Sequence, residues 1–233
     1  MEFLQDHTSY RIYPISEYAV TVEWPSEQYF HLVRQLDERL SNNAIPGCRE
    51  TVPAYNTLTI FLDVQQTDVM TVTALLHKLL ESAEASILTA SPPEGRLLEI
   101  PVCYGTDWGP DLSDAARQCG LSDSEFIDIH SGREYQVFML GFAPGFPYMG
   151  WVDGRIALKR HDRPRMKVAA GSVAIAGTQT GIYPNDSPGG WQIIGQTPLP
   201  LITDDPEDSF LFHPGDRVKF VPITAETFKS LKG

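Results

Sequence analysis

The stretch YQVFMLGFAPGFPYMGW, residues 135–151, decides the fold class of the second half of the chain. Its first residues alternate or are apolar, as in a short strand. Residues 141–151 then hold three glycines, two prolines and four aromatic rings, a combination that excludes a helix. The stretch is too apolar for an ordinary surface loop, so it predicts rigid turns that hold aromatic side chains beside short strands.

Short strands of the same kind continue toward the C-terminus. They are found in GSVAIAG (171–177), GWQIIGQT (190–197) and SFLFHPGDRVKFVPI (209–223), separated by Gly, Pro, Asn and Asp. This spacing predicts a β-barrel or a β-sandwich and argues against a parallel α/β sheet.

Two short helices are expected before these strands. Residues 109–120 read as a helix capped by Asp111 or Ser113, and in residues 121–132 Ser122 and Glu125 form a capping-box pattern. The second half of the chain is therefore expected to be mostly β, with little helix.

The first half follows a different pattern, strand, helix, strand, strand, helix. YAVTVEW alternates like a half-buried strand, and Ser26 is a candidate N-cap for the helix that follows. Two strands are expected around Pro53, and a strongly apolar helix capped by Thr67 comes next. This order resembles the ferredoxin-like α+β folds.

A change of composition separates the two halves. The segment TASPPEGR, residues 89–96, has paired prolines and a glycine that resist both helix and strand. We therefore expect a small α+β domain over residues 1–91 and a barrel domain over residues 92–233.

Composition limits the class of protein. The chain has 233 residues, 42% of them hydrophobic and 21% charged, and a net charge of −12; these values indicate a globular protein and disfavour nucleic acid as a partner. No apolar run reaches the roughly 20 residues that span a bilayer, and the N-terminus does not resemble a secretory signal. Three widely spaced cysteines with no C-x-x-C pair favour reduced thiols in a cytoplasmic protein without a metal site.

A basic segment runs against the acidic charge of the chain. It contains Lys159, Arg160, Arg163, Arg165 and Lys167. In an extended strand, Arg163, Arg165 and Lys167 would share one face, where they would suit a carboxylate or a phosphate. A solvated edge strand, on which cations block unwanted pairing, explains the same residues.

The stretch AGSVAIAGTQTGIYPNDSPGGWQIIGQTP, residues 170–198, is the other informative region. Its glycines allow close backbone approach, and Gln179, Tyr183, Ser187 and Trp191 add hydrogen-bonding groups and a large ring. The stretch fits a pocket wall and, equally, the turns that any barrel needs.

His130 is a candidate proton carrier because it lies just before the aromatic stretch, although a lone histidine is more often structural. The sequence has no glycine-rich phosphate-binding motif, no zinc-protease motif and no serine-hydrolase motif. If the chain serves an ATP-dependent reaction, the nucleotide must bind at an unusual site or on a partner.

The motifs together resemble one family. FMLGFAPGFPYMGWV (138–152), RPRMKVAAGSVAIAGTQTGIYPNDSPGGWQIIGQTP (163–198) and HPGDRVKFVPI (213–223) are similar to the family of 5-oxoprolinase B subunits. Its members also carry the names allophanate hydrolase subunit 1 and KipI-type inhibitor of a sporulation histidine kinase. The first half of the chain matches more loosely.

The resemblance implies a cyclophilin-like β-barrel after the α+β domain, a partner C subunit with a related barrel, and an A subunit. It implies a hydrolase complex that opens 5-oxo-L-proline to L-glutamate at the expense of ATP, with this chain inactive alone. On this basis Arg165 and Arg163 are expected to bind an anion and His130 to carry a proton. Orienting groups are expected to be Gln179, Tyr183 and Ser187, and the pocket or the partner interface is expected to contain Phe142, Pro144, Phe146, Tyr148, Trp151 and Trp191.

Two other functions remain open at this point. The same family name covers an inhibitor that binds a histidine kinase and blocks its autophosphorylation, and the barrel motifs do not separate the two. A peptidyl-prolyl isomerase is suggested by the barrel fold alone, which is weak evidence for activity.

Overall fold

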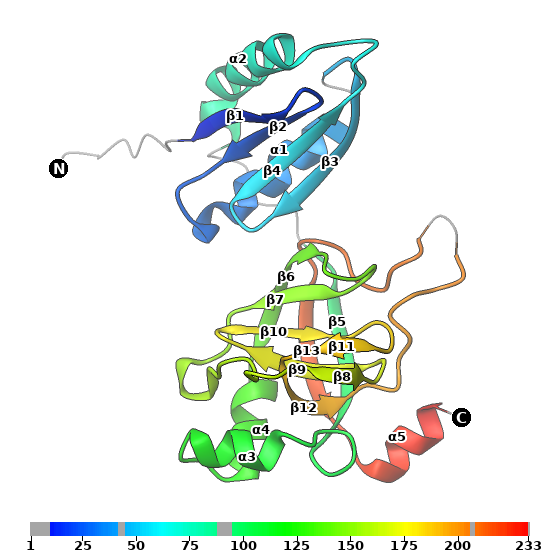
Figure 1. Ribbon diagram of the computed structural model, residues 1–233. Coiled ribbons are helices and arrows are strands. Elements are labelled where there is room, and N and C mark those ends of the chain that lie inside the picture. The colour runs from blue at the N-terminus through cyan, green and yellow to red at the C-terminus, as the bar shows by residue number, and fades with distance from the viewer. Residues whose placement is uncertain (1–9, 42–44, 88–94, 206–207, 233) are drawn as a thin grey trace, which may run out of the picture. The chain divides into compact units, whose positions relative to one another are not determined.

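The computed structural model describes residues 10–41, 45–87, 95–205 and 208–232. Contacts within the chain divide it into two compact units, residues 1–94 and 95–233, which are described separately here (Figure 1). The domain boundary expected between residues 91 and 92 lies outside the described residues. Within the described part of the chain, no helix has the length and apolar character needed to cross a bilayer.

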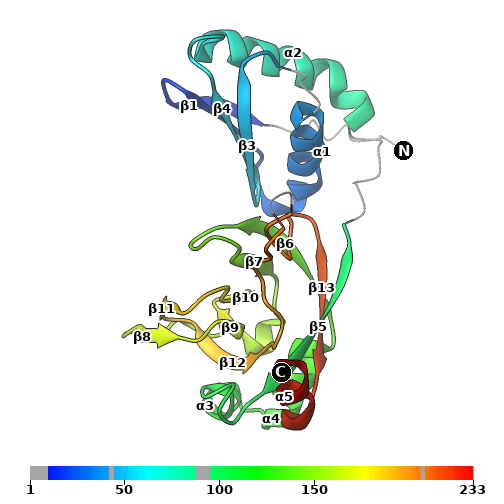
Figure 2. The same ribbon diagram turned by 90° about the vertical axis from the view of Figure 1, so that its right-hand side faces the viewer.

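The first unit is an antiparallel four-stranded sheet with two helices. Its strands lie in the order β1-β2-β4-β3, and both helices lie on the same side of the sheet (Figure 2). The elements are β1 (Arg11–Ser16), β2 (Ala19–Glu23), the 3₁₀ turn η1 (Glu27–Tyr29), α1 (Phe30–Ser41), β3 (Cys48–Ala54), β4 (Thr57–Leu62) and α2 (Val69–Ile87).

The core of this unit follows the apolar periodicity of the sequence. Paired residues of the two central strands, Val20 with Ile60 and Val22 with Leu58, are fully buried. The buried residues of α1 recur on one face of the helix, as a helix packed on a sheet requires. They are Phe30, Leu32, Val33, Gln35, Leu36 and Leu40.

Three local expectations for this unit were wrong. The strands β3 and β4 meet at Tyr55 and not at Pro53, which β3 tolerates because it is an edge strand. Ser26 precedes a 3₁₀ turn and makes no capping hydrogen bond through its side chain. The second helix begins one residue later than expected, and Asp68 in place of Thr67 accepts a hydrogen bond from the Thr71 N–H.

The second unit contains a closed barrel of seven strands in the order β10-β7-β6-β13-β5-β12-β9, and a separate pair, β11-β8. Its strands are β5 (Leu97–Tyr104), β6 (Glu134–Leu140), β7 (Pro147–Gly150), β8 (Arg165–Val168), β9 (Ser172–Ala176), β10 (Gln179–Ile182), β11 (Ser187–Gly189), β12 (Gln192–Gln196) and β13 (Arg217–Pro222). The helices are α3 (Leu112–Gln118), α4 (Asp123–Ser131), the 3₁₀ turn η2 (Gly154–Ile156) and α5 (Ala225–Lys232). The expected barrel is therefore present.

A parallel pair of strands distant in sequence helps to close the barrel. The strand β13 pairs with β5 from Arg217 opposite Leu97 to Pro222 opposite Val102. Neither the strand β1, nor β5, nor the helix α5 was expected from the sequence. Of the stretch 209–223, only the residues of β13 form a strand of the barrel.

Helix ends in this unit agree in part with the sequence. The capping box of Ser122 and Glu125 is confirmed at the start of α4. Asp111 occupies the N-cap position of α3, but its side chain makes no capping hydrogen bond. Ser113 donates its hydroxyl hydrogen to Asp123. The carboxylate of Asp111 is engaged elsewhere, at the candidate site.

Candidate functional site in the barrel

The glycines and prolines of the aromatic stretch allow rings to pack closely. Phe146 ends the turn before β7 and is 1% exposed. Its ring lies over Gly181 of β10, where an added Cβ would come within 2.8 Å of the Phe146 ring. A side chain at that position would therefore displace the ring.

Phe146 is the centre of an aromatic cluster. Its ring centroid lies 4.9 Å from that of Tyr148, 5.2 Å from Tyr183 and 5.4 Å from Trp191, always edge to face. This geometry is the favoured one for aromatic pairs. Phe142 packs edge-on against Phe146 but remains 66% exposed, at the rim of the cluster.

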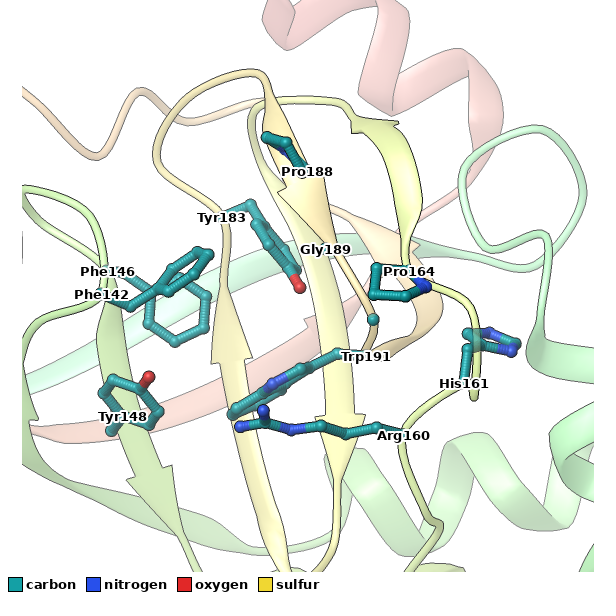
Figure 3. A pocket seen from close by; sticks show the side chains of 11 residues that line it. Phe142, Phe146, Tyr148, Arg160, His161, Pro164, Tyr183, Pro188, Gly189 and Trp191 are labelled. Carbon is teal, nitrogen blue, oxygen red and sulfur yellow. The ribbon is translucent and has the colours of Figure 1, made fainter.

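The cluster forms the wall of a pocket of about 460 Å³, within the range of small-molecule sites. All the lining residues belong to the barrel unit and converge on one hollow (Figure 3). They are Phe142, Phe146, Tyr148, Arg160, His161, Pro164, Tyr183, Pro188, Gly189, Gly190 and Trp191. No Asp or Glu is among them.

The structure separates the cations of the basic segment. Arg165 makes a two-pronged contact with Asp111, with N–O distances of 2.9 and 2.5 Å, and Lys167 pairs with Asp186 at 2.7 Å. Neither side chain lines the pocket. Arg160 does, and its guanidinium carbon lies 5.9 Å from the centroid of the Trp191 ring, within reach of a cation–π contact.

The Asp111 carboxylate ties this segment to the barrel. It is nearly buried and accepts the backbone N–H of Ile193 at 2.6 Å in addition to the Arg165 guanidinium. His161 Nε2 lies 3.2 Å from the same carboxylate, and the His161 backbone N–H donates to the Gly190 carbonyl. Asp111 therefore fixes the segment 160–165 that forms one side of the pocket.

The Tyr183 hydroxyl points into the pocket near Trp191 (Figure 3). Burial raises the pKa of Tyr183, and a hydrogen bond from the Trp191 backbone N–H and the charges of Arg160 and Arg165 lower it by less. The phenol is therefore protonated near neutral pH. Burial likewise raises the pKa of Tyr148, against the opposing charge of Arg160.

His130 lies in the barrel interior and not in the pocket. It is fully buried, its ring stacks on Phe220 with 4.7 Å between centroids, and Tyr104 Oη lies 2.8 Å from Nδ1. Burial lowers the pKa of His130 to about 3. A proton carrier must contact the group that it protonates, so this location argues against the role expected for His130.

The other expected residues also lie outside the pocket. Arg163 and Pro144 are exposed, and Gln179 is half-buried at the start of β10. Ser187 lies on β11, and its buried hydroxyl has no hydrogen-bond partner among the described residues. Trp151 packs on Phe138, with 5.4 Å between centroids. Of the residues expected at a site, the pocket brings together Phe142, Phe146, Tyr148, Tyr183 and Trp191.

Sequence reasoning missed Arg160, His161 and Asp111. Arg160 was among the basic residues of the segment, but the alternation argument favoured Arg163, Arg165 and Lys167. His161 adjoins Arg160 in sequence, and this adjacency to a cation was its one available signal. For a metal ion, the described residues offer no group of three or more His, Cys, Asp or Glu side chains.

Comparison with known proteins agrees with this architecture. Residues 10–212 match the family model of the carboxyltransferase domain, subdomain C and D. The barrel and its pocket thus belong to the carboxyltransferase-domain class. A crystal structure of the Kluyveromyces lactis urea carboxylase shares the fold with a TM-score of 0.69 over 96% of this chain and 22% of that chain, at 18% identity.

Curated relatives are similar over nearly their whole length. This chain is 38% identical to the 5-oxoprolinase B subunit of Bacillus subtilis, over 96% of this chain and 97% of the relative. It is 41% identical to the 5-oxoprolinase B subunit of Escherichia coli O157:H7, over 91% of this chain and 95% of the relative. The chain belongs to the family of 5-oxoprolinase B subunits.

Proposed function

We propose that this chain is the B subunit of a heteromeric, ATP-dependent 5-oxoprolinase that opens 5-oxo-L-proline to L-glutamate. The observation that carries the proposal is the identity of 38–41% to two 5-oxoprolinase B subunits over at least 95% of their length. The partners proposed are the A and C subunits, and the compartment proposed is the cytoplasm. No observation favours the alternative of a histidine-kinase inhibitor or an isomerase.

The pocket suits a small cyclic amide with a negative charge. Aromatic walls accept the flat faces of a compact ring, and a guanidinium in a lining without carboxylates favours an anion. The task of this chain would be to hold the lactam in a fixed orientation while the amide bond is opened.

ATP does not fit the groups that this chain offers. The sequence has no glycine-rich phosphate loop, and the carboxylates of Asp111 and Asp186 already engage Arg165 and Lys167. We therefore propose that the nucleotide binds to a partner protein of the complex.

We also propose finer fold assignments. The order β2-α1-β3-β4-α2 with β1 beside β2 fits a ferredoxin-like unit whose last strand is supplied from the N-terminal side. For the barrel unit we propose the cyclophilin-like type, and we keep residues 1–91 and 92–233 as the proposed domains.

The test is ATP-dependent release of glutamate from 5-oxo-L-proline by this chain mixed with the candidate A and C subunits. Each protein and ATP are omitted in turn. We expect release only when all components are present. Release that persists without this chain, or no release in any combination, would contradict the proposal.

A further inference from the structure

The polar groups of the pocket are mainly hydrogen-bond donors. The side chains that bring polar atoms to the lining are Arg160, His161, Tyr148, Tyr183 and Trp191. Of these, His161 is already hydrogen-bonded through Nε2 to Asp111. In Figure 3 its ring points away from Trp191 and Tyr183. The pocket therefore calls for a ligand that accepts hydrogen bonds.

Arg160 supplies the charge. Among the residues that the structure describes, no carboxylate pairs with Arg160, whereas Arg165 and Lys167 each have one. In Figure 3 its side chain extends along Trp191, on the same side of the pocket as Tyr148. A guanidinium held over an aromatic face with donors free is suited to a carboxylate.

Tyr183 supplies a neutral donor at a second point. Its hydroxyl oxygen accepts from the Trp191 backbone N–H, so the hydroxyl hydrogen is available to another acceptor. A carbonyl oxygen would complete this hydrogen bond. The backbone contact also fixes the oxygen, which limits where the carbonyl can lie.

We propose that the pocket is a two-point site for a compact ring that carries a carboxylate and an amide carbonyl, with Arg160 binding the carboxylate and Tyr183 donating to the carbonyl oxygen. The choice of 5-oxo-L-proline as the probe rests on the proposed function. The two-point geometry rests on the pocket itself.

Gly189 sets the position of the Tyr183 ring. A Cβ added at Gly189 would lie 2.4 Å from Tyr183 Oη and 2.7 Å from its Cζ, distances that real Cβ contacts do not show. An alanine there must push the hydroxyl out of place. At the neighbouring Gly190, the nearest atoms to an added Cβ are 3.7 Å away, so alanine fits. Gly189 is therefore a specificity-determining residue and Gly190 is its matched control.

The experiment is a titration of the full chain with 5-oxo-L-proline, followed by NMR at the tryptophan indole N–H groups. We expect a saturable shift of the Trp191 resonance. Arg160→Gln and Tyr183→Phe should each weaken binding about tenfold, the size expected for one lost charged or partly buried hydrogen bond. Gly189→Ala should weaken it at least as much as Tyr183→Phe, and Arg163→Gln and Gly190→Ala should leave it unchanged.

Ligand variants test the two points separately. 2-Pyrrolidinone lacks the carboxylate, so Arg160→Gln should not weaken its binding further. L-Proline lacks the carbonyl, so it should be insensitive to Tyr183→Phe. Far-ultraviolet circular dichroism of each variant monitors folding.

Two results would overturn the inference. One is the absence of a saturable shift at millimolar ligand, and the other is equal loss of affinity in Arg160→Gln and Arg163→Gln. If glutamate release still requires this chain in either case, the proposed function stands without this site. If binding follows the expected pattern but no combination of the three proteins releases glutamate, the site stands and the proposed function fails.

Discussion

The barrel unit contains two aromatic clusters that differ in access. In the barrel interior, His130, Tyr135 and Phe220 pack with each other and are fully buried. In the pocket, Phe146 and Trp191 are also nearly buried, but they border a hollow of about 460 Å³. The first cluster can contribute only stability, while the second can also bind a ligand. Residue type alone does not separate the two, because both contain rings and titratable groups.

The largest expected effect breaks the interior cluster. Phe220→Ala removes a fully buried ring that stacks on His130 and should lower the free energy of unfolding by about 3–5 kcal/mol. Phe142→Ala, at the exposed rim of the pocket, should change it by less than about 0.5 kcal/mol. Chemical denaturation measures both. Similar losses in the two variants would show that the rim is packed as tightly as the interior.

A smaller effect is expected where the pocket segment is attached to the barrel. Asp111→Ala leaves the Arg165 guanidinium and the Ile193 N–H without their acceptor, which should cost about 3 kcal/mol of stability. Asp186→Ala breaks the exposed pair with Lys167 and should cost under about 1 kcal/mol. The comparison would fail if thermal and chemical unfolding ranked the two variants in the opposite order.

The smallest effect concerns protonation of His130. Thr180 donates its hydroxyl hydrogen to the Ala174 carbonyl, so His130 Nε2, 3.0 Å from the same hydroxyl oxygen, is the protonated ring nitrogen. Nδ1 then accepts from Tyr104 Oη. Glutamine can offer a donor and an acceptor at this position without titrating.

The pKa of His130, lowered by burial to about 3, makes stability depend on pH. Below the unfolded-state pKa of about 6.5, the unfolded chain binds a proton that the folded chain does not. Stability should therefore fall by about 1.4 kcal/mol per unit as pH drops from about 6.5 toward 3. Above pH 6.5 this contribution is fully present and constant.

Denaturation between about pH 7 and 4.5, within the window where the folded and unfolded proton affinities differ, tests this dependence. The His130→Gln variant should lose less stability than the native chain over the same range, because its interior no longer excludes a proton. Parallel profiles for the two proteins would show that His130 is protonated in the folded state or does not determine the slope.

Local patterns in the sequence determined much of the fold. The alternating segments predicted barrel strands now seen as β6, β9, β12 and β13, and the capping box predicted the start of α4. The glycines and rings of residues 141–151 predicted a rigid aromatic wall, and its members Phe142, Phe146 and Tyr148 do line the pocket. These features depend on neighbours a few residues apart, which a sequence displays directly.

Only the tertiary structure decided which charged group serves the pocket. Arg165 meets Asp111 from 54 residues away, and this pairing exists only because the barrel brings β8 and the start of α3 together. The same closure places His130 inside the barrel and leaves Arg160 beside Trp191. Periodicity assigns a side chain to a face of its own element. Whether that face meets a carboxylate, a packed core or open solvent depends on contacts between distant segments, and no local pattern encodes them.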